Sequence, residues 1–327
     1  MPASKYHFLK NMERGKENMH YHIYCPVCEK YLGKRDDLSD IINCTCGEQI
    51  SVSEVKTFFL SVSLEGQLCE LLNNSDVRNS MMTYRFKGKN SQESLEDIYD
   101  EHAYQRLFIN DGILSSPFNF SYCFNTDGAL MGKSSDKTIW PIYVMLIELP
   151  PKDRSRHMLL AGLYVANKDP NQKIFLQPFV EEANILANRG FDWIHDGKTV
   201  NSKMIPLCAI VDSVARWQML NMSSFNAHYG CTFCCIKTER TLKGQRFAIP
   251  TGTISKRTAE STSRDMEEAY SRRDEKRAKD RIVKGVKGPS PLIRLAYFNI
   301  ISGFVPDYMH AMLLGVIRLQ TDHFRIC

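Results

Sequence analysis

The stretch that decides the fold is Phe118-Asn-Phe-Ser-Tyr-Cys-Phe-Asn-Thr-Asp127, an apolar segment that ends in an acid. A second apolar segment, Met204-Ile-Pro-Leu-Cys-Ala-Ile-Val-Asp212, ends in the same way. Both have the length and composition of buried strands, and packing gives no reason for an acid where such a strand reaches the surface. Paired carboxylates at a sheet edge suit a divalent metal ion such as Mg²⁺ or Mn²⁺. Asp127 and Asp212 are therefore the candidate catalytic pair.

The segments around this pair predict a mixed sheet. We expect strands at 118–126, 138–149, 157–165 and 203–211, with helices at 172–188 and 213–220. Short connections and the Pro150-Pro151 break favour an antiparallel meander for the first three strands, with Pro141 at an edge or a bulge. The first helix then crosses over and returns the fourth strand parallel to the first. This order is that of an α/β, ribonuclease-H-like fold, and it brings the two acids together.

Both acids also have an ordinary structural explanation. Asp127 begins an Asp-Gly turn and can cap it, and Asp212 precedes a predicted helix and can cap that helix. From the pair alone these explanations are the better ones, because capping acids are common.

Four cysteines near the N-terminus form two pairs separated by fifteen residues. They are Cys25, Cys28, Cys44 and Cys46. Pairs with this spacing can meet around a tetrahedral Zn²⁺, which orders a segment too short to have a core of its own. We expect a structural zinc site, with buried free thiols as the alternative and His20 or His22 as alternative ligands. Helices are expected after this module, at 58–74 and 91–107.

A second cysteine cluster follows the second acid. Cys231 and Cys234 can bind zinc together with His228 or with the distant His310. His310 belongs to a D-x-x-H arrangement that begins at Asp307. The alternative is that Asp307 caps a helix and His310 is a partly buried ring with ordinary partners.

Charge is distributed unevenly along the chain. The net charge is +5, but residues 236–287 hold fifteen Lys and Arg against eight Asp and Glu, a balance of +7 that leaves −2 for the remainder. A basic segment on a mildly acidic body indicates a polyanion partner, with DNA first; a solvated helix of mixed charge explains it equally well. The expected contacts are Arg272, Arg273, Lys276 and Arg277.

Three further residues are accessory candidates because they lie close to the two acids in the sequence. Lys133 can contact a phosphate, and Arg216 with Trp217, one helical turn beyond Asp212, can orient that acid or contact a backbone phosphate. Ordinary helix packing is the alternative for Arg216 and Trp217.

Composition narrows the class of protein. The 327 residues are 43% hydrophobic and 24% charged, as in soluble globular proteins. No uninterrupted apolar run is long enough to span a bilayer, and residues 1–10 lack the apolar core of a signal peptide. We therefore expect no membrane contact and a reducing compartment, cytosol or nucleus, where the eleven cysteines are thiols or metal ligands rather than disulfides.

Taken together, several motifs resemble one family. They are Asn125-Thr-Asp127-Gly, Ser134-Ser135, Ile139-Trp140-Pro141-Ile142, Leu149-Pro150-Pro151, Phe175-Leu176-Gln177-Pro178-Phe179-Val180-Glu181-Glu182, Ala209-Ile-Val-Asp212, Gly230-Cys231-Thr-Phe-Cys234 and Asp307-Tyr-Met-His310-Ala311. In order and spacing, over residues 118–316, they are similar to the catalytic core of CACTA (En/Spm-type) transposases. The cysteine-rich N-terminus looks like that of animal members.

This resemblance implies a DDE/D nuclease core that cuts and joins DNA at the ends of a transposable element with Mg²⁺ or Mn²⁺. Asp127 matches the first acid and Asp212 the second, while Cys231, Cys234, Asp307 and His310 match accessory motifs. The N-terminal zinc module would assist DNA or subunit contact. Nuclear location, DNA as partner and action as a homo-oligomer are expected with it.

The sequence departs from the family pattern at the third acid. In the family this acid, usually Glu, lies well beyond the D-x-x-H motif, and no Glu follows Met309. We therefore expect a C-terminally truncated, transposase-derived protein that is inactive or only binds DNA. The alternative is a host-retained, zinc-containing DNA- or protein-interaction module without catalysis.

The expected organisation has six parts. They are a loose N-terminus (1–20), a zinc-knuckle or ribbon-like module (21–57), a helical linker region (58–115), the first part of the ribonuclease-H-like core (116–222), a cysteine-bearing basic insertion (223–305) and the start of a truncated C-terminal part (306–327).

Overall fold

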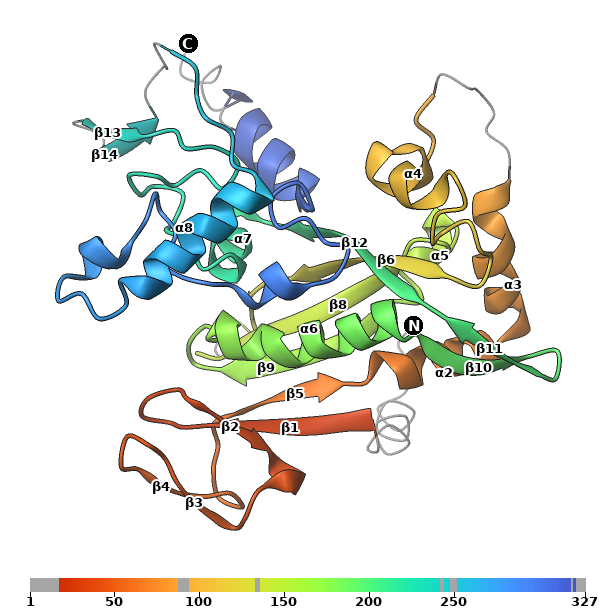
Figure 1. The fold of residues 1–327 in the computed structure, drawn as a ribbon, viewed down its shortest axis with the longest axis horizontal. Helices are drawn as coiled ribbons and strands as arrows, with labels where there is room; N and C mark the ends of the chain where they lie inside the picture. The colour runs from red at the N-terminus through yellow and green to blue at the C-terminus, as the bar shows by residue number, and fades with distance from the viewer. Residues whose placement is uncertain are drawn as a thin grey trace.

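The structure, a computed structural model, describes residues 18–87, 94–132, 136–241, 244–247, 252–318 and 320–321. One mixed sheet of nine strands runs through the molecule, with helices packed against it (Figure 1). Eight strands follow the order β15-β12-β6-β8-β9-β5-β1-β2, and β7 pairs with β8. The predicted α/β class with a mixed sheet is confirmed.

The centre of the sheet follows the predicted order. β6 (Phe120–Thr126), β8 (Thr138–Leu146) and β9 (Leu159–Ala166) form an antiparallel meander. β12 (Met204–Val211) runs parallel to β6 on its other side. The meander and the parallel return of the fourth strand are thus confirmed. The next strand, β15 (Phe304–Pro306), is parallel to β12 and was not predicted.

The two strands that precede the acids are buried along almost their whole length. This burial explains why both read as continuous apolar runs, since strands covered on both faces do not alternate. Pro141 lies in β8 between two neighbours, so the edge position expected for it is wrong. The register of β8 against β9 shifts between Ile142 and Tyr143, which is the bulge alternative.

The crossover helix has the predicted bounds. α6 (Gln172–Asn188) begins where the side chain of Asn171 accepts the N–H of Lys173 and ends before Gly190, whose φ is +78°. In Figure 1 it lies across β8 and β9. Its buried side chains are Gln172, Phe175, Leu176, Phe179, Val180, Ala183, Leu186 and Ala187. This apolar stripe covers one face of the sheet.

The opposite face is covered by the segment around α4 (His102–Phe108). Tyr99 and Tyr104 belong to a buried cluster with Cys123 and Cys208 of the central strands. Because neighbouring residues of a strand point to opposite faces, Phe124 packs in the cluster that contains α6 instead.

The N-terminal strands extend the same sheet. β1 (Met19–Tyr24) pairs with β2 (Tyr31–Lys34) and with β5 (Phe58–Val62), and β5 pairs with β9. The strands on either side of residue 57 therefore belong to one sheet. The lower lobe of Figure 1, with β3 (Ile41–Asn43) and β4 (Gln49–Ser51), lies at the end of that sheet.

The helix predicted from Phe58 to Asn74 is wrong in its first part. Residues Phe58–Val62 are strand β5, and only α2 (Leu64–Asn73) is helical, beginning after its N-cap Ser63. Aromatic and β-branched residues paired on both sides of a strand outweigh helical spacing here. The helix expected at 91–107 is also shorter: the structure has a 3-10 turn, η4 (Ile98–Asp100), and then α4, while residues 91–93 lie outside the described part.

A hairpin was missed between α6 and β12. β10 (Phe191–His195) pairs with β11 (Lys198–Ser202) through the turn Asp196-Gly197. Both turn residues have positive φ, 48° and 75°. Such a turn matches the twist of paired strands, and an Asp-Gly step favours it.

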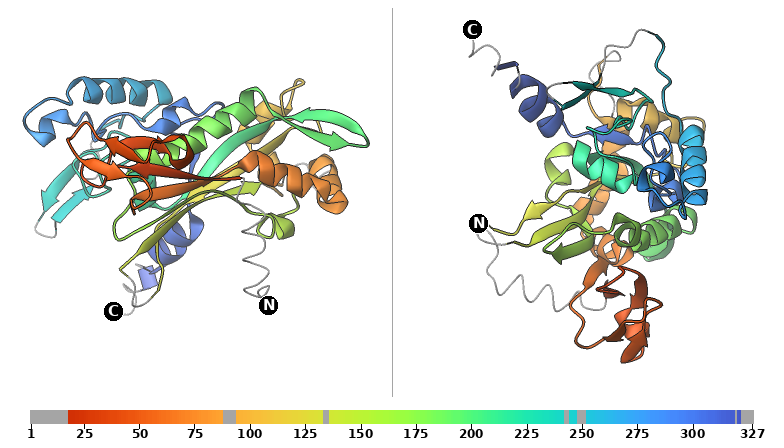
Figure 2. Two further views of the ribbon diagram at one scale, coloured as in Figure 1. Left: turned by 90° about the horizontal axis from the view of Figure 1, so that it is seen from below. Right: turned by 90° about the vertical axis from the view of Figure 1, so that its left-hand side faces the viewer.

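The remaining elements are short or lie at the periphery. They are η2 (Arg35–Asp37), β3 (Ile41–Asn43), β4 (Gln49–Ser51), α3 (Ser75–Thr83), η3 (Tyr84–Phe86), β7 (Ala129–Leu130), α5 (Pro151–Arg154), α7 (Ser213–Met219), β13 (Thr238–Thr241), β14 (Gly244–Phe247), α8 (Ala259–Ser271), η5 (Ala278–Arg281), η6 (Pro291–Arg294) and η7 (Met309–Ile317). η7 projects from the body of the molecule (Figure 2), and its apolar side chains are exposed.

Candidate functional site

Three aspartates mark one edge of the central sheet. Asp127, Asp212 and Asp307 are the residues that immediately follow β6, β12 and β15. These strands are neighbours and parallel, and Ala209 lies opposite Phe124, so the register carries Asp212 to the level of Asp127. The N–H of Asp307 donates to the carbonyl of Val211 at 3.2 Å, and this hydrogen bond connects Asp307 to the end of β12.

The charges of these groups affect one another. Burial raises the pKa of Asp127, and the negative charge of Asp212 raises it further; the N–H of Gly128 and the ring of His310 act in the opposite direction. His310 lies 2.5 Å from Asp307 Oδ2. That hydrogen bond raises the pKa of His310, and the charges of all three aspartates act in the same direction.

Two of the aspartates also cap helical turns. Oδ1 of Asp212 accepts the N–H of Ala215 at 2.6 Å, so the capping explanation for this acid is realised. Asp307 accepts the N–H of Met309 at 3.0 Å through Oδ1 and holds His310 with Oδ2. A carboxylate that uses one oxygen as a cap still offers the other. The hydrogen bonds above use one oxygen of Asp212 but both oxygens of Asp307.

The three aspartates lie next to one another, but their carboxylate oxygens do not all come within 4.8 Å of one another. Among the described residues, one group of three or more His, Cys, Asp or Glu has ligand atoms that all lie within 4.8 Å of one another, and it is the N-terminal cysteine cluster.

That cluster consists of Cys25, Cys28, Cys44 and Cys46. The sulfurs of Cys25 and Cys46 are 3.6 Å apart, and those of Cys28 and Cys44 are 3.5 Å apart. Four thiolates at about 2.3 Å from one tetrahedral Zn²⁺ stand about 3.8 Å from each other. The arrangement therefore fits a metal ion such as zinc, as the sequence predicted.

Backbone groups affect the charge of one thiol and the turn geometry in this cluster. The N–H of Cys46 donates to the sulfur of Cys44, and this hydrogen bond together with the neighbouring thiols lowers the pKa of the Cys44 thiol to about 6. Gly47 has a φ of +93°, which closes the second knuckle without strain. His22 is not part of the set, because its ring nitrogens bond the hydroxyls of Tyr31 and Ser61, each at 2.8 Å.

The second cysteine cluster lacks a third ligand among the described residues. The N–H of Phe233 donates to the sulfur of Cys231, and burial raises the pKa of Cys234. His228 Nδ1 lies 3.2 Å from the carbonyl oxygen of Thr238. His310 is held by Asp307 at the edge of the sheet instead.

The accessory candidates lie as follows. Lys133 falls outside the described residues. Arg216 and Trp217 lie on α7, the helix that Asp212 caps. The guanidinium of Arg216 lies over the ring of Phe233, with Cζ 4.5 Å from its centroid.

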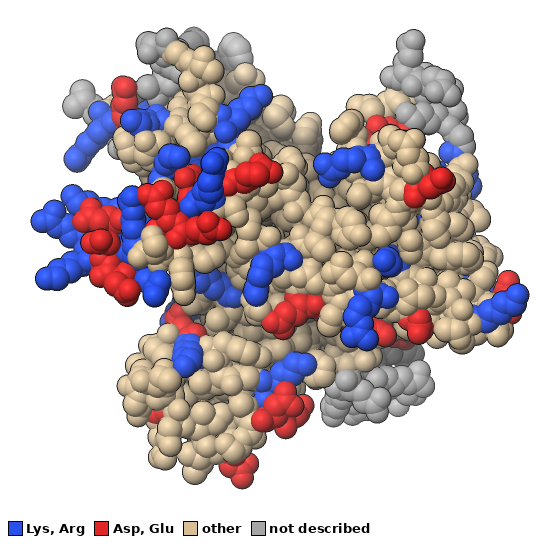
Figure 3. All heavy atoms as spheres, in the orientation of Figure 1, with Lys and Arg blue, Asp and Glu red and all other residues tan. Residues whose placement is uncertain are grey.

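The basic segment is exposed, but its charge is mixed. Arg272 forms an ion pair with Glu268, and Nε of Arg273 lies 3.8 Å from Oδ2 of Asp274. Figure 3 shows basic and acidic side chains interspersed around α8, and the acids reduce the local field. Lys276 and Arg277 follow α8 and are exposed.

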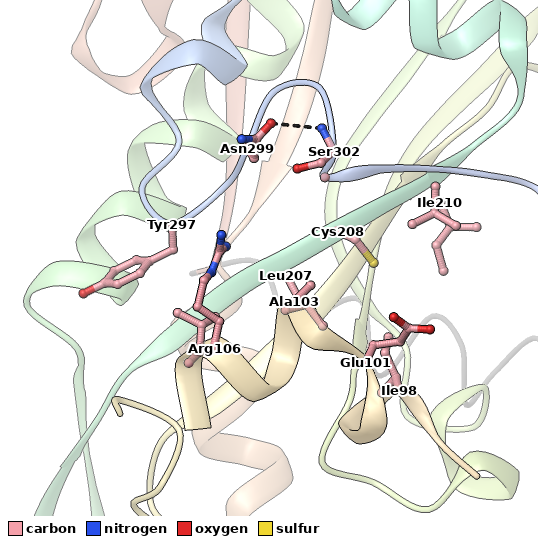
Figure 4. Close-up of a pocket in the computed structure, with 13 residues that line it drawn as sticks. Ile98, Glu101, Ala103, Arg106, Leu207, Cys208, Ile210, Tyr297, Asn299 and Ser302 are labelled. Carbon is pink, nitrogen blue, oxygen red and sulfur yellow. Dashed lines mark hydrogen bonds between the residues drawn. The ribbon is translucent and has the colours of Figure 1, made fainter. Parts of the chain in front are cut away.

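A cavity of about 410 Å³ lies on the face of the sheet covered by α4 (Figure 4). Apolar residues of β12, such as Cys208 and Ile210, line it together with Arg106 of α4 and the loop before β15. None of the three aspartates lines it.

Sequence reasoning missed Asp307 as a strand-end acid. The only signal was the short apolar run before it, and β15 has just three residues.

A scan against protein-family models and a search of curated proteins both find no match to this chain. Within the described residues, no helix combines the length and apolarity needed to cross a membrane.

Proposed function

We propose that this chain carries the DNA-binding core of a CACTA-type DDE/D transposase, built on a ribonuclease-H-like sheet. The observation that carries this proposal is the placement of Asp127 and Asp212 after two adjoining parallel strands. The strand order, an antiparallel meander followed by a crossover helix and a parallel strand, is the order that the family resemblance implies.

Asp127 and Asp212 would hold one divalent cation, Mg²⁺ or Mn²⁺. A cation at this edge would relieve the repulsion that raises the pKa of Asp127. When bound, such an ion polarises a phosphodiester and activates a water or hydroxyl nucleophile. The contribution of the chain is to place two oxygen ligands where a DNA strand can reach them.

We further propose that this chain cleaves DNA little or not at all. A third carboxylate stands beside the pair, but both oxygens of Asp307 are engaged, by the N–H of Met309 and by His310. When protonated, the ring of His310 would also neutralise the charge of Asp307. Two acids hold a catalytic ion more weakly than three, so DNA binding is the main activity that we assign.

DNA contact would extend from this edge to the basic segment, through Lys276 and Arg277 first, because Arg272 and Arg273 already have acidic neighbours. The cysteine cluster would order the N-terminal lobe for DNA or subunit contact. A protein that acts on chromosomal DNA is expected in the nucleus.

The decisive experiment measures Mn²⁺ binding by calorimetry and DNA binding by fluorescence anisotropy, with cleavage of labelled DNA followed in parallel. We expect Asp127→Asn and Asp212→Asn to weaken Mn²⁺ binding at least 10-fold. The matched control is Asp196→Asn, because Asp196 lies in the exposed β10–β11 turn. Equal Mn²⁺ affinity in all three variants would end the metal assignment.

The same DNA measurements test the alternative function, a zinc-containing interaction module without a DNA site. The observation that favours it is the cysteine cluster, which needs no catalysis to explain it. Absence of DNA binding at low salt, where phosphate contacts are strongest, would support this alternative over the transposase core.

A further inference from the structure

A small cavity lies one helical turn beyond Asp212. It has a volume of about 170 Å³ and is lined by α7, by the loop that contains Cys231 and by the end of β14. This volume is well below the roughly 300 Å³ at which pockets for drug-sized ligands begin. The space therefore suits one flat ring or one small group that belongs to a larger ligand.

Three phenylalanines surround this cavity. Phe225, Phe233 and Phe247 are 53%, 36% and 46% exposed, although phenylalanine is among the residues most often buried. Phe225 and Phe233 lie in the loop between α7 and β13, and Phe247 is the last residue of β14, so the fold of this region brings the three side chains to one cavity. Exposed aromatic faces around a slot offer stacking surfaces to a planar ligand.

The same cavity carries hydrogen-bond donors that lack acceptors, and the guanidinium of Arg216 lies over the ring of Phe233. Nε and Nη1 of Arg216 and Nε1 of Trp217 are buried, and none has a hydrogen-bond partner among the described residues. Asp212, one turn earlier on the same helix, uses Oδ1 to accept the N–H of Ala215. Arg216 is half-buried and two of its guanidinium nitrogens lack acceptors, so an anionic group of the ligand would complete this cation.

We propose that this cavity holds one unpaired nucleotide of a DNA strand, with its phosphate on Arg216 and its base against Phe225 and Phe247. Aromatic platforms beside a cation are the usual means of binding single-stranded DNA. A base inside a duplex keeps its faces stacked and cannot enter a slot of this kind. This inference rests on the proposed function, because it requires DNA at Asp212.

The position of the cavity gives it a role. Arg216 lies four residues from Asp212, about 6 Å along the axis of α7. That distance is close to the spacing of neighbouring phosphates along one strand. A strand whose phosphate lies at the aspartates would thus place its next nucleotide at Arg216, and the protein would select DNA with a frayed or flipped residue there.

The test uses duplex DNA with a short single-stranded overhang that carries 2-aminopurine, and the same duplex with blunt ends. We expect the protein to bind the overhang DNA more tightly and to quench 2-aminopurine. Phe225→Ala and Phe247→Ala should each weaken overhang binding about 5-fold or more and reduce the quenching, with blunt-duplex affinity unchanged. Phe247→Tyr should restore both.

The matched control is Phe86→Ala, which removes an equally exposed phenylalanine (47%) from η3. It should leave both affinities unchanged. Arg216→Gln should lower the salt dependence of overhang binding by about one phosphate contact. Thermal unfolding of each variant checks that it is folded.

The two proposals fail in different ways. If the unaltered protein binds DNA but the phenylalanine variants bind overhang and blunt DNA as it does, the nucleotide pocket is wrong and the transposase core stands. An equal loss for both DNAs would also overturn the pocket. If the unaltered protein binds neither DNA, the proposed function itself is wrong.

Discussion

His22 shows how one buried side chain can make stability depend on pH. Its ring stacks on Phe59 with centroids 4.8 Å apart and bonds two hydroxyls. Burial is the main reason that the pKa of His22 falls from 6.5 to about 4, with the charge of Lys34 adding to it. The folded protein therefore resists protonation of this ring, whereas the unfolded chain does not.

We predict that His22→Gln makes stability less sensitive to acid. Between pH 6.5 and about 4 the unfolded chain binds the proton first, so the contribution of His22 is complete above pH 6.5 and is lost as the pH falls. The loss in unfolding free energy should be about 2 kcal/mol, after allowance for partial solvation of the ring. Urea unfolding at several pH values measures it, with exposed His102→Gln as control. Parallel pH profiles for the two variants would contradict this assignment.

A second prediction concerns Cys28, an exposed member of the cysteine cluster. Cys28→Ser should lower the bound zinc from one ion per chain and reduce the melting temperature, because three thiolates no longer close the tetrahedron. Atomic emission after gel filtration measures the metal. Cys69→Ser is the control, since Cys69 lies outside the cluster and bonds the carbonyl of Asp192. Unchanged zinc in Cys28→Ser would exclude the site.

At the scale of elements, α6 supports α2 through a single carboxylate. Glu182 accepts the N–H groups of Leu64 at 2.7 Å and Glu65 at 3.3 Å, and the hydroxyl of Ser63 at 3.0 Å. These groups form the start of α2, where N–H groups have no partner within the helix. The negative charge also suits the positive end of the helix dipole.

We predict that Glu182→Ala lowers the unfolding free energy by about 2 kcal/mol, the upper range for losing a helix cap. Glu181→Ala, which alters an exposed neighbour on the same helix, should cost about 0.5 kcal/mol or less. Chemical denaturation of both variants measures the difference. Equal destabilisation would mean that Glu182 does not act as a cap.

The elements also show why some sequence patterns predict the secondary structure correctly and others do not. α6 was predicted with its observed bounds because its apolar stripe is long. The helix prediction is wrong at Phe58–Val62, since five residues hold too little periodicity to distinguish a strand from a helix. The pairing of β5 with β1 and β9 decided that segment.

At the scale of the whole molecule, a buried ion pair joins parts that are distant in sequence. Arg85 and Glu148 lie 3.2 Å apart with both side chains fully buried. Glu148 also accepts the N–H and the hydroxyl of Ser121 at the start of β6, each at 2.7 Å. The segment after α3 is thereby linked to the two central strands.

The sequence by itself determined the strand order around Asp127 and Asp212 and the cysteine pairs of the N-terminal cluster. Both depend on local patterns: continuous apolar runs, a long amphipathic helix and closely spaced thiols. Only the tertiary structure decided that β15 sets Asp307 beside the pair and that Phe225, Phe233 and Phe247 line one cavity with Arg216. The first placement depends on pairing between strands far apart in the chain, and the second on how the irregular segment after α7 folds. Neither kind of contact leaves a periodic signal in the residues that make it.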